Sequence, residues 1–200
     1  MSIYYNFAPD LKHIWQDLLV QLKQATSNPT NPLRTLSLAT RGSQGTDVRM
    51  VILRNFDVSL LHCTFYTDSR AKKNIHIQTE PYVTLLAYDA TIRRQIRLYG
   101  IAKACDQHTR TQQWNQLTSQ SKTLYATQSN PGSIHTSRIK ANQLLDLDDA
   151  QDNFMSYRIY IHKIEDLQLI SSPIQRTAFH INRVAHTHAI ESIQGQYLTP

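Results

Sequence analysis

Residues 34–67 read RTLSLATRGSQGTDVRMVILRNFDVSLLHCTFYT, and this stretch decides the expected fold. Polar and apolar side chains alternate over Arg34–Thr40, which is the pattern of a half-buried strand. Gly42–Gly45 predicts a turn, and β-branched and aromatic residues predict further strands at Val48–Asn55 and Leu60–Thr67. Three strands joined by such short connections favour an antiparallel meander over strand–helix–strand units.

The rest of the chain adds helices and more strands around this meander. The predicted helices are residues 10–24, Ser69–Gln78 (with Asp68 or Ser69 as its cap) and Asp106–Thr127, and the predicted strands are Tyr82–Tyr88, Ile92–Ala104, Tyr157–Ile164 and Thr177–Asn182. Residues 132–152 are assigned to a helix followed by a polar loop. We expect a mainly β chain with flanking helices (α+β), built as a six- or seven-stranded antiparallel barrel.

No internal repeat or linker divides the sequence, so one domain over residues 1–200 is expected. It would comprise the N-terminal helix at about 10–24, the barrel at about 33–183 and a C-terminal tail at 184–200. The chain is 40% hydrophobic and 18% charged, which suits a packed core. Its apolar runs are far shorter than the roughly 20 residues of a membrane span, and the N-terminus lacks a signal-peptide pattern.

Composition also narrows the function classes. The two cysteines lie far apart and the nine histidines are scattered, so neither a disulfide framework nor a metal site is expected, and a cytoplasmic location follows. The net charge of +6 suggests a polyanionic partner, a phosphorylated ligand or simply a basic surface. Nucleic acid is disfavoured because the basic residues form no single stripe. Glycine-rich phosphate-loop motifs are absent.

The segment after the third strand carries the clearest anion signal. Thr67 and Ser69 end a strand, and Arg70 and Lys72 open the next helix. Helix N-termini present free N–H groups and a positive dipole end, where basic side chains are unfavourable unless an anion binds. This pattern predicts a phosphate site, and a solvated basic turn is the alternative.

Two other strands carry weaker signals. Over Arg49–Arg54, the side chains of Arg49 and Val51 share one face, and those of Met50 and Ile52 share the other with Arg54. An arginine at each end could reach a ligand, although many strands end in an arginine that simply reaches solvent. Gln95 follows a strand start and could pair with the pyrimidine edge of a flavin, or lie on the surface.

Taken in order, these motifs resemble the pyridoxamine 5′-phosphate oxidase superfamily. The matching segments are Leu36–Arg41, Arg49–Asp57, Phe65–Arg70, Arg94–Gly100 and Gln128–Ser129. The resemblance implies an antiparallel split β-barrel that forms a homodimer and binds FMN at the subunit interface. The residues implied to contact FMN are Arg49, Met50, Val51, Ile52, Arg54, Tyr66, Thr67, Ser69, Arg70, Lys72, Gln95, Gln128 and Ser129, the last two from the second subunit.

The resemblance is incomplete where the substrate would bind. The family's Ser-Arg-Lys reads Ser69-Arg70-Ala71-Lys72 here, and its substrate-phosphate and pyridoxal-ring motifs are not evident. We therefore expect a flavin-dependent oxidoreductase acting on an unassigned small molecule. Arg54, where the family usually has lysine near the isoalloxazine, is the candidate catalytic residue. The alternative is a non-catalytic protein that binds FMN or another phosphorylated cofactor.

Overall fold

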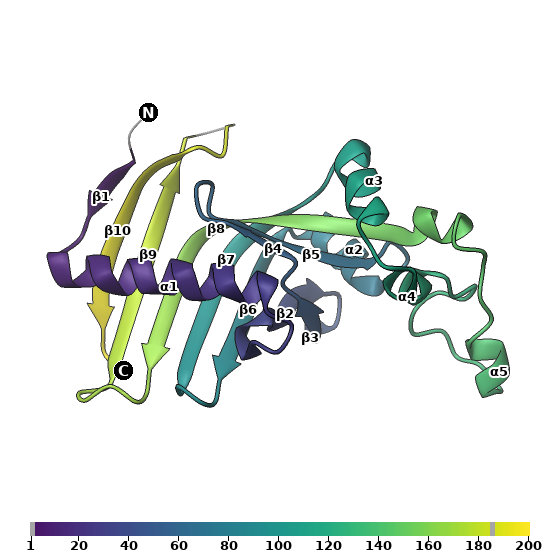
Figure 1. Cartoon of the computed structure of the whole chain (residues 1–200), viewed down its shortest axis with the longest axis horizontal. Helices are drawn as coiled ribbons and strands as arrows, with labels where there is room; N and C mark the ends of the chain where they lie inside the picture. Colours follow the sequence, from purple (N-terminus) through teal and green to yellow (C-terminus); the bar gives the residue numbers. More distant parts are fainter. Residues whose placement is uncertain (1–2, 185–186) are drawn as a thin grey trace.

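The computed structural model describes residues 3–184 and 187–200, which form a ten-stranded sheet with helices around it (Figure 1). Its strands are β1 (Tyr4–Asn6), β2 (Thr35–Gly42), β3 (Gly45–Ile52), β4 (Asn55–Asp57), β5 (His62–Asp68), β6 (Tyr82–Asp89), β7 (Arg94–Ala104), β8 (Phe154–Gln168), β9 (Gln175–Arg183) and β10 (Ile190–Leu198). The order is β1-β10-β9-β8-β7-β6-β2-β3, and β4 and β5 continue from β8. The mainly β fold with flanking helices is confirmed.

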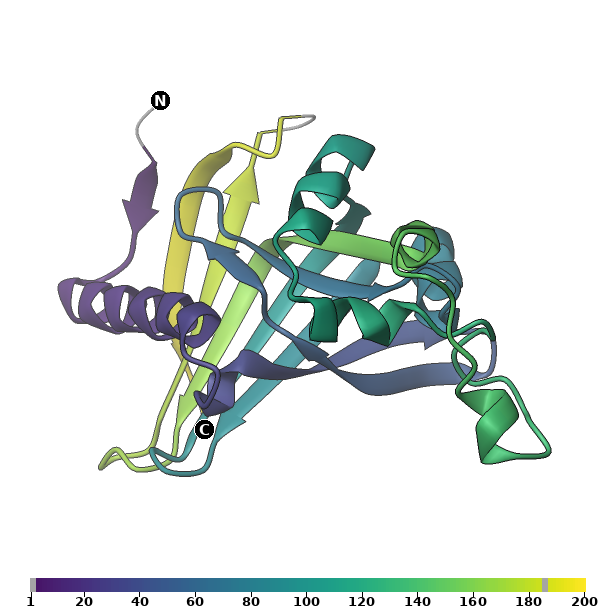
Figure 2. The ribbon, with the colours of Figure 1, turned by 45° about the vertical axis from the view of Figure 1, so that its right-hand side comes forward.

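The helices lie on one face and at one end of the sheet (Figures 1 and 2). They are α1 (Pro9–Ser27), α2 (Lys72–Thr79), α3 (Gln107–Asn115), α4 (Ser119–Lys122) and α5 (Arg138–Ala141), with 3-10 turns at Pro32–Arg34, Thr123–Tyr125 and Asp149–Asn153. In both views α1 crosses the strands, whereas α3, α4 and α5 gather at the end away from β1. Within the described residues, no helix is long and apolar enough to cross a membrane.

Strand β8 splits the sheet into two parts. Along its first half it pairs with β5 on one side, and along its second half it pairs with β9 on that side. On its other side β8 pairs with β7 from Tyr157 to Gln168. The sheet therefore divides at the point along β8 where the neighbouring strand changes from β5 to β9. The core fills the space between the two parts. Phe65 and Tyr157 stack there with ring centroids 5.5 Å apart.

Helix α1 closes this core because its apolar side chains recur at helical spacing. Its buried residues are Leu11, Trp15, Leu18, Leu22 and Ala25. The Trp15 ring lies 4.9 Å from the ring of Phe179 on β9, measured between centroids. The helix starts at Pro9, where the missing N–H costs nothing, and ends at Ser27.

Several predicted boundaries were wrong. The strand expected to reach Asn55 ends at Ile52, because Leu53 N–H bonds Arg34 O and Arg54 N–H bonds Thr64 O instead. Helix α2 begins three residues later than predicted, with Ala71 at its N-cap. The helix predicted over 106–127 is broken into α3, α4 and a 3-10 turn.

The C-terminal segment is the largest difference. Residues 184–200, predicted as a tail, contain β10, which pairs antiparallel with β9 and parallel with β1. Strands β1, β10 and the short β4 were not predicted, and they raise the number of strands above the predicted six or seven. The segment carries few of the strong alternation signals of β2, so its strand character comes from its hydrogen-bonding partners.

Candidate functional site

A group of cationic and hydroxyl side chains gathers where β2, β3, β5 and α2 meet. Lys73 Nζ donates to Thr67 Oγ1 at 2.9 Å. Arg49 Nη1 donates to Thr40 Oγ1 at 2.5 Å, and Arg49 also pairs with Asp47. We call Arg49, Thr67 and Lys73 the anion cluster. Side chains alternate between the two faces of a strand, and Arg49 and Thr40 both lie on the face of the β2–β3 hairpin that buries Leu38.

The positive charges of Lys73 and Arg49 in the anion cluster repel each other. Burial lowers the pKa of Lys73, and the nearby charge of Arg49 lowers it further, whereas Asp68 and Asp47 act in the opposite direction. Helix α2 begins beside Lys73 without a side-chain cap and without an acidic residue in its first turn. Positive side chains therefore meet the positive end of a helix, and a bound anion would stabilise both.

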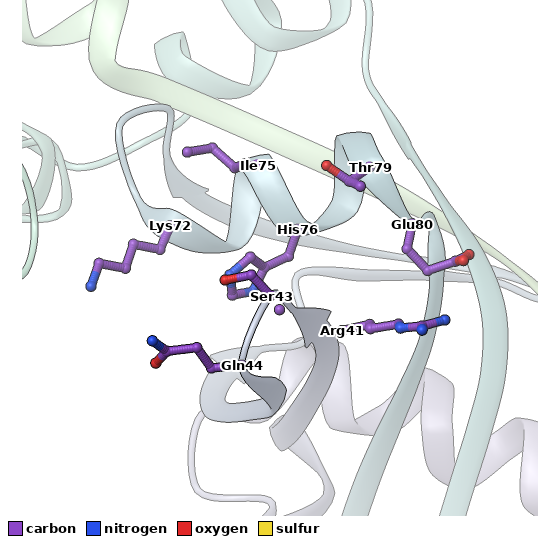
Figure 3. A pocket seen from close by; sticks show the side chains of 9 residues that line it. Arg41, Ser43, Gln44, Lys72, Ile75, His76, Thr79 and Glu80 are labelled. Carbon is purple, nitrogen blue, oxygen red and sulfur yellow. The ribbon is translucent and has the colours of Figure 1, made fainter.

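His76 connects α2 to the β2–β3 hairpin next to the anion cluster. Its Nδ1 lies 3.1 Å from Thr40 Oγ1, the hydroxyl that accepts from Arg49. A pocket of about 740 Å³ lies beyond His76, between α2 and the hairpin turn (Figure 3). Its lining residues are Arg41, Gly42, Ser43, Gln44, Lys72, Ile75, His76, Thr79 and Glu80.

The structure changes which lysine joins Thr67. Lys72, predicted as a phosphate ligand, is exposed and extends outward from the start of α2 in Figure 3. Lys73 occupies the position beside Thr67 instead. One sequence signal could have revealed this. Ile77 is buried and lies four residues after Lys73, so the two share the inward face of the helix.

A second group lies on the opposite face of β5. The guanidinium carbon of Arg54 lies 5.2 Å from the centre of the Tyr66 ring, a cation–π distance. Burial raises the pKa of Tyr66 and raises that of the nearby Tyr125 to about 12, so both phenols stay protonated at neutral pH. Arg54 and Tyr66 are thus brought together, but successive residues of a strand face opposite sides, so Tyr66 points away from Thr67.

Ser69 and Arg70 bond to other parts of the same chain. Ser69 Oγ donates to Asp152 O at 3.3 Å. The Arg70 guanidinium pairs with Asp68 and donates to the carbonyl of Gln128 at 3.2 Å. Gln128 and Ser129 therefore lie beside Arg70 of their own chain, and their predicted contact with flavin in a second subunit stays a prediction.

The remaining predicted residues line the outside of the sheet or its core. Val51 is buried in the core, whereas Met50 is exposed on the outer face. Strand β3 hydrogen-bonds only to β2 within the described residues, so one edge of its backbone is free at Met50–Ile52. Gln95 lies on β7, three strands from β3 and therefore roughly 14 Å away at the usual strand spacing of about 4.8 Å.

A charged network neighbours Gln95 on this face. Glu165 accepts from Lys163 at 2.5 Å and from Arg176 at 2.9 Å, and Arg97 lies 3.1 Å away. Burial opposes ionisation of Glu165, but the hydrogen bonds from Lys163 and Arg176 and the charge of Arg97 lower its pKa to about 2. Arg176 is thus held by Glu165 within one chain.

Comparison with known proteins shows which sequences the chain resembles. Residues 12–106 match the family model described as pyridoxamine 5′-phosphate oxidase, FMN-binding domain. A pyridoxine/pyridoxamine 5′-phosphate oxidase of Acinetobacter baylyi is 31% identical over 100 residues, which span 50% of this chain and 45% of that protein. The chain thus aligns with less than half of this relative's length.

Two solved structures share the fold over nearly the whole chain. A pyridoxamine 5′-phosphate oxidase-related, FMN-binding protein from Nostoc punctiforme has a TM-score of 0.76 at 21% identity, with 100% of each chain covered. PhzG from Burkholderia lata, solved with tetrahydrophenazine-1-carboxylic acid, has a TM-score of 0.72 at 17% identity, with 97% of this chain and 98% of that one covered. Motifs, family model and fold agree, and the chain is similar to the FMN-binding split-barrel proteins related to pyridoxamine 5′-phosphate oxidase.

Proposed function

We propose that this protein binds FMN and that the anion cluster holds its phosphate. The observation that carries the proposal is Lys73, a half-buried lysine with a lowered pKa, placed beside Arg49 at an uncapped helix start. A phosphate dianion would accept from Lys73, Thr67, Arg49 and the first N–H groups of α2. Each hydrogen bond to a charged group contributes about 1.5–3 kcal/mol.

The free edge of β3 suits the ring of the same cofactor. The backbone at Met50–Ile52 offers N–H and C=O groups that no other strand uses within the described residues. A flavin pyrimidine edge carries matching donors and acceptors. FMN, when bound, supplies hydride or electron transfer, and the chain would supply position and electrostatics. Arg54, held over Tyr66, would place a positive charge near the ring and favour its reduced, anionic form.

The outer sheet face supports a homodimer with FMN at the interface. Val48 and Met50 on β3 are 58% and 60% exposed, and Tyr82 and Tyr88 on β6 are 60% and 48% exposed. The register puts Met50, Ser37 and Leu86 side by side across β3, β2 and β6. An exposed apolar surface of this kind is typical of a protein interface. A second copy would cover it and bring its own residues toward the free edge of β3.

Binding is tested with FMN and riboflavin, which differ only by the phosphate. The Lys73→Ala variant should bind FMN about 10- to 100-fold more weakly, which corresponds to about 1.4–2.8 kcal/mol, and should bind riboflavin as the wild type does. The matched control is Lys72→Ala, because Lys72 is its exposed neighbour, and its FMN affinity should stay within about threefold. Equal losses in both variants, or none in Lys73→Ala, would contradict the proposed phosphate site.

We further propose that the protein is an oxidoreductase with a small-molecule substrate. Turnover separates this activity from simple FMN binding. An enzyme should consume a reductant faster than the same concentration of free FMN, and Arg54→Ala should slow flavin reduction. If Arg54→Ala reduced its flavin as fast as the wild type, Arg54 would have no part in the mechanism. If turnover did not exceed that of free FMN, the alternative of a non-catalytic FMN-binding protein would be favoured.

A further inference from the structure

The pocket beyond His76 borders the anion cluster. A smaller pocket of about 260 Å³ adjoins it and shares His76 and the turn residues 42–44 as walls. This smaller pocket reaches Asp47, which pairs with Arg49 of the anion cluster. His76 also contacts Thr40 Oγ1, the hydroxyl that accepts from Arg49. A phosphate held by the anion cluster would therefore lie beside the two pockets, which we together call the hairpin pocket.

The hairpin pocket carries a cation on each side of His76. In Figure 3, Lys72 and Gln44 lie on one side of the His76 ring. Arg41 and Glu80 lie on its other side. The ion pairs of the described residues include neither Lys72 nor Arg41. Because Lys72 begins α2 next to the anion cluster, a second phosphate joined to the first would meet a positive charge there.

The two ends of the hairpin pocket suit different parts of a nucleotide. At the end near the anion cluster, Lys72 offers a charge for a phosphate, and the Gln44 amide offers donors and an acceptor for ribose hydroxyls. At the other end, the planar Arg41 guanidinium can stack on a base, and the Glu80 carboxylate can accept from its amino group. The larger pocket has about 740 Å³, within the range of about 300–1,000 Å³ for small-molecule sites. An adenylate supplies these groups in this order.

We propose that the hairpin pocket binds an adenylate joined to the flavin phosphate, so that the protein takes FAD with its FMN half in the site described above. This inference rests on the proposed function, because the first phosphate must occupy the anion cluster. Lys73 and Arg49 then serve FMN and FAD alike, whereas Arg41 and Glu80 serve FAD alone. Lys72, which the sequence resemblance places at the flavin phosphate, binds the second phosphate instead.

FMN and FAD test the proposal because they share the flavin and the first phosphate. The wild-type protein should bind FAD at least as tightly as FMN, although the linked phosphate of FAD carries less charge, because the adenylate adds contacts of its own. Arg41→Ala should weaken FAD binding about tenfold and leave FMN binding within about threefold. Lys73→Ala should weaken the binding of both. Weaker binding of FAD than of FMN by the wild type, or equal losses for both in Arg41→Ala, would overturn the proposal.

A variant that fills the hairpin pocket tests it without removing a charge. Thr79 is exposed and lines the larger pocket at the end of α2. Thr79→Trp should therefore leave FMN binding unchanged, which also shows that the variant is folded, and should weaken FAD binding at least about tenfold. Thr79→Ser is the matched control and should bind both flavins as the wild type does. Wild-type FAD affinity in Thr79→Trp would mean that the adenylate does not enter the pocket.

AMP distinguishes a joined adenylate from a separate one. If AMP bound to the FMN-loaded protein while FAD bound more weakly than FMN, the hairpin pocket would be a separate nucleotide site, and the joined cofactor would be refuted. A wild-type protein that binds neither FMN nor FAD would refute the proposed function itself. Binding of FMN without any binding of FAD would refute only this inference, so the two failures are distinguishable.

Discussion

Replacement of Asp166 should destabilise the fold by leaving a buried arginine charge without its main partner. Arg94 on β7 is 4% exposed and Asp166 on β8 is 1% exposed. Arg94 Nε donates to Asp166 Oδ1 at 2.7 Å and Nη2 donates to Oδ2 at 2.9 Å, so the pairing is bidentate. Arg94 also pairs with Asp17 of α1, whose side chain is 51% exposed. The three residues tie α1 to the two central strands.

The size of the effect follows from burial. Asp166→Asn leaves the Arg94 charge buried without its main partner, which costs about 3–5 kcal/mol. A domain of this size has an unfolding free energy of about 5–15 kcal/mol, so the variant should lose a large share of it. At about 2–4 °C per kcal/mol, the melting temperature should fall by roughly 6–20 °C. Asp17→Asn should cost about 1 kcal/mol or less, because half-exposed pairs contribute little.

Urea unfolding followed by tryptophan fluorescence measures these differences, since Trp15 and Trp114 are both 3% exposed. A double replacement, Arg94→Met with Asp166→Leu, removes both charges and should recover most of the lost stability. If Asp166→Asn cost no more than Asp17→Asn, or if the double replacement were as unstable as Asp166→Asn, the buried charge would not be the cause and the reasoning would fail.

Two pH dependences follow from other charged groups. FMN affinity should fall as pH rises through the lowered pKa of Lys73, beginning below the ordinary value of 10.5, because only the charged amine attracts phosphate. Fluorescence titration should show that riboflavin affinity does not fall in this way as pH rises. The Lys73→Arg variant stays charged, so its FMN affinity should not fall either. If FMN affinity in Lys73→Arg fell with pH as in the wild type, Lys73 would not be the source of the pH dependence. The ionised Glu165 should stabilise the fold fully above its ordinary pKa of 4.5, and this contribution should disappear as pH falls toward about 2. Urea unfolding over this pH range should show that the unfolding free energy of Glu165→Gln falls less steeply on acidification than that of the wild type. Identical slopes would contradict this prediction.

The sequence was sufficient for the features that depend on local periodicity. The alternation of Arg34–Thr40 predicted β2 and its buried side at Leu36 and Leu38, and the helical spacing of Leu11, Trp15 and Leu18 predicted α1. Both periods follow from backbone geometry, which repeats every two residues in a strand and every 3.6 in a helix. The basic start of α2 was predicted for the same reason, since dipole and charge are both local.

Contacts between distant residues were decided by the tertiary structure alone. Ile190–Leu198 became β10 because β9 supplied a partner, and the pattern of this segment is weak. The sequence did not predict that the fold brings Asp68 and Thr127 to the donors of Arg70. Lys73, one residue from the predicted Lys72, is the half-buried cation because α2 turns that face toward Thr67. A donor binds whichever acceptor folding brings within about 3 Å, and sequence spacing does not encode that distance.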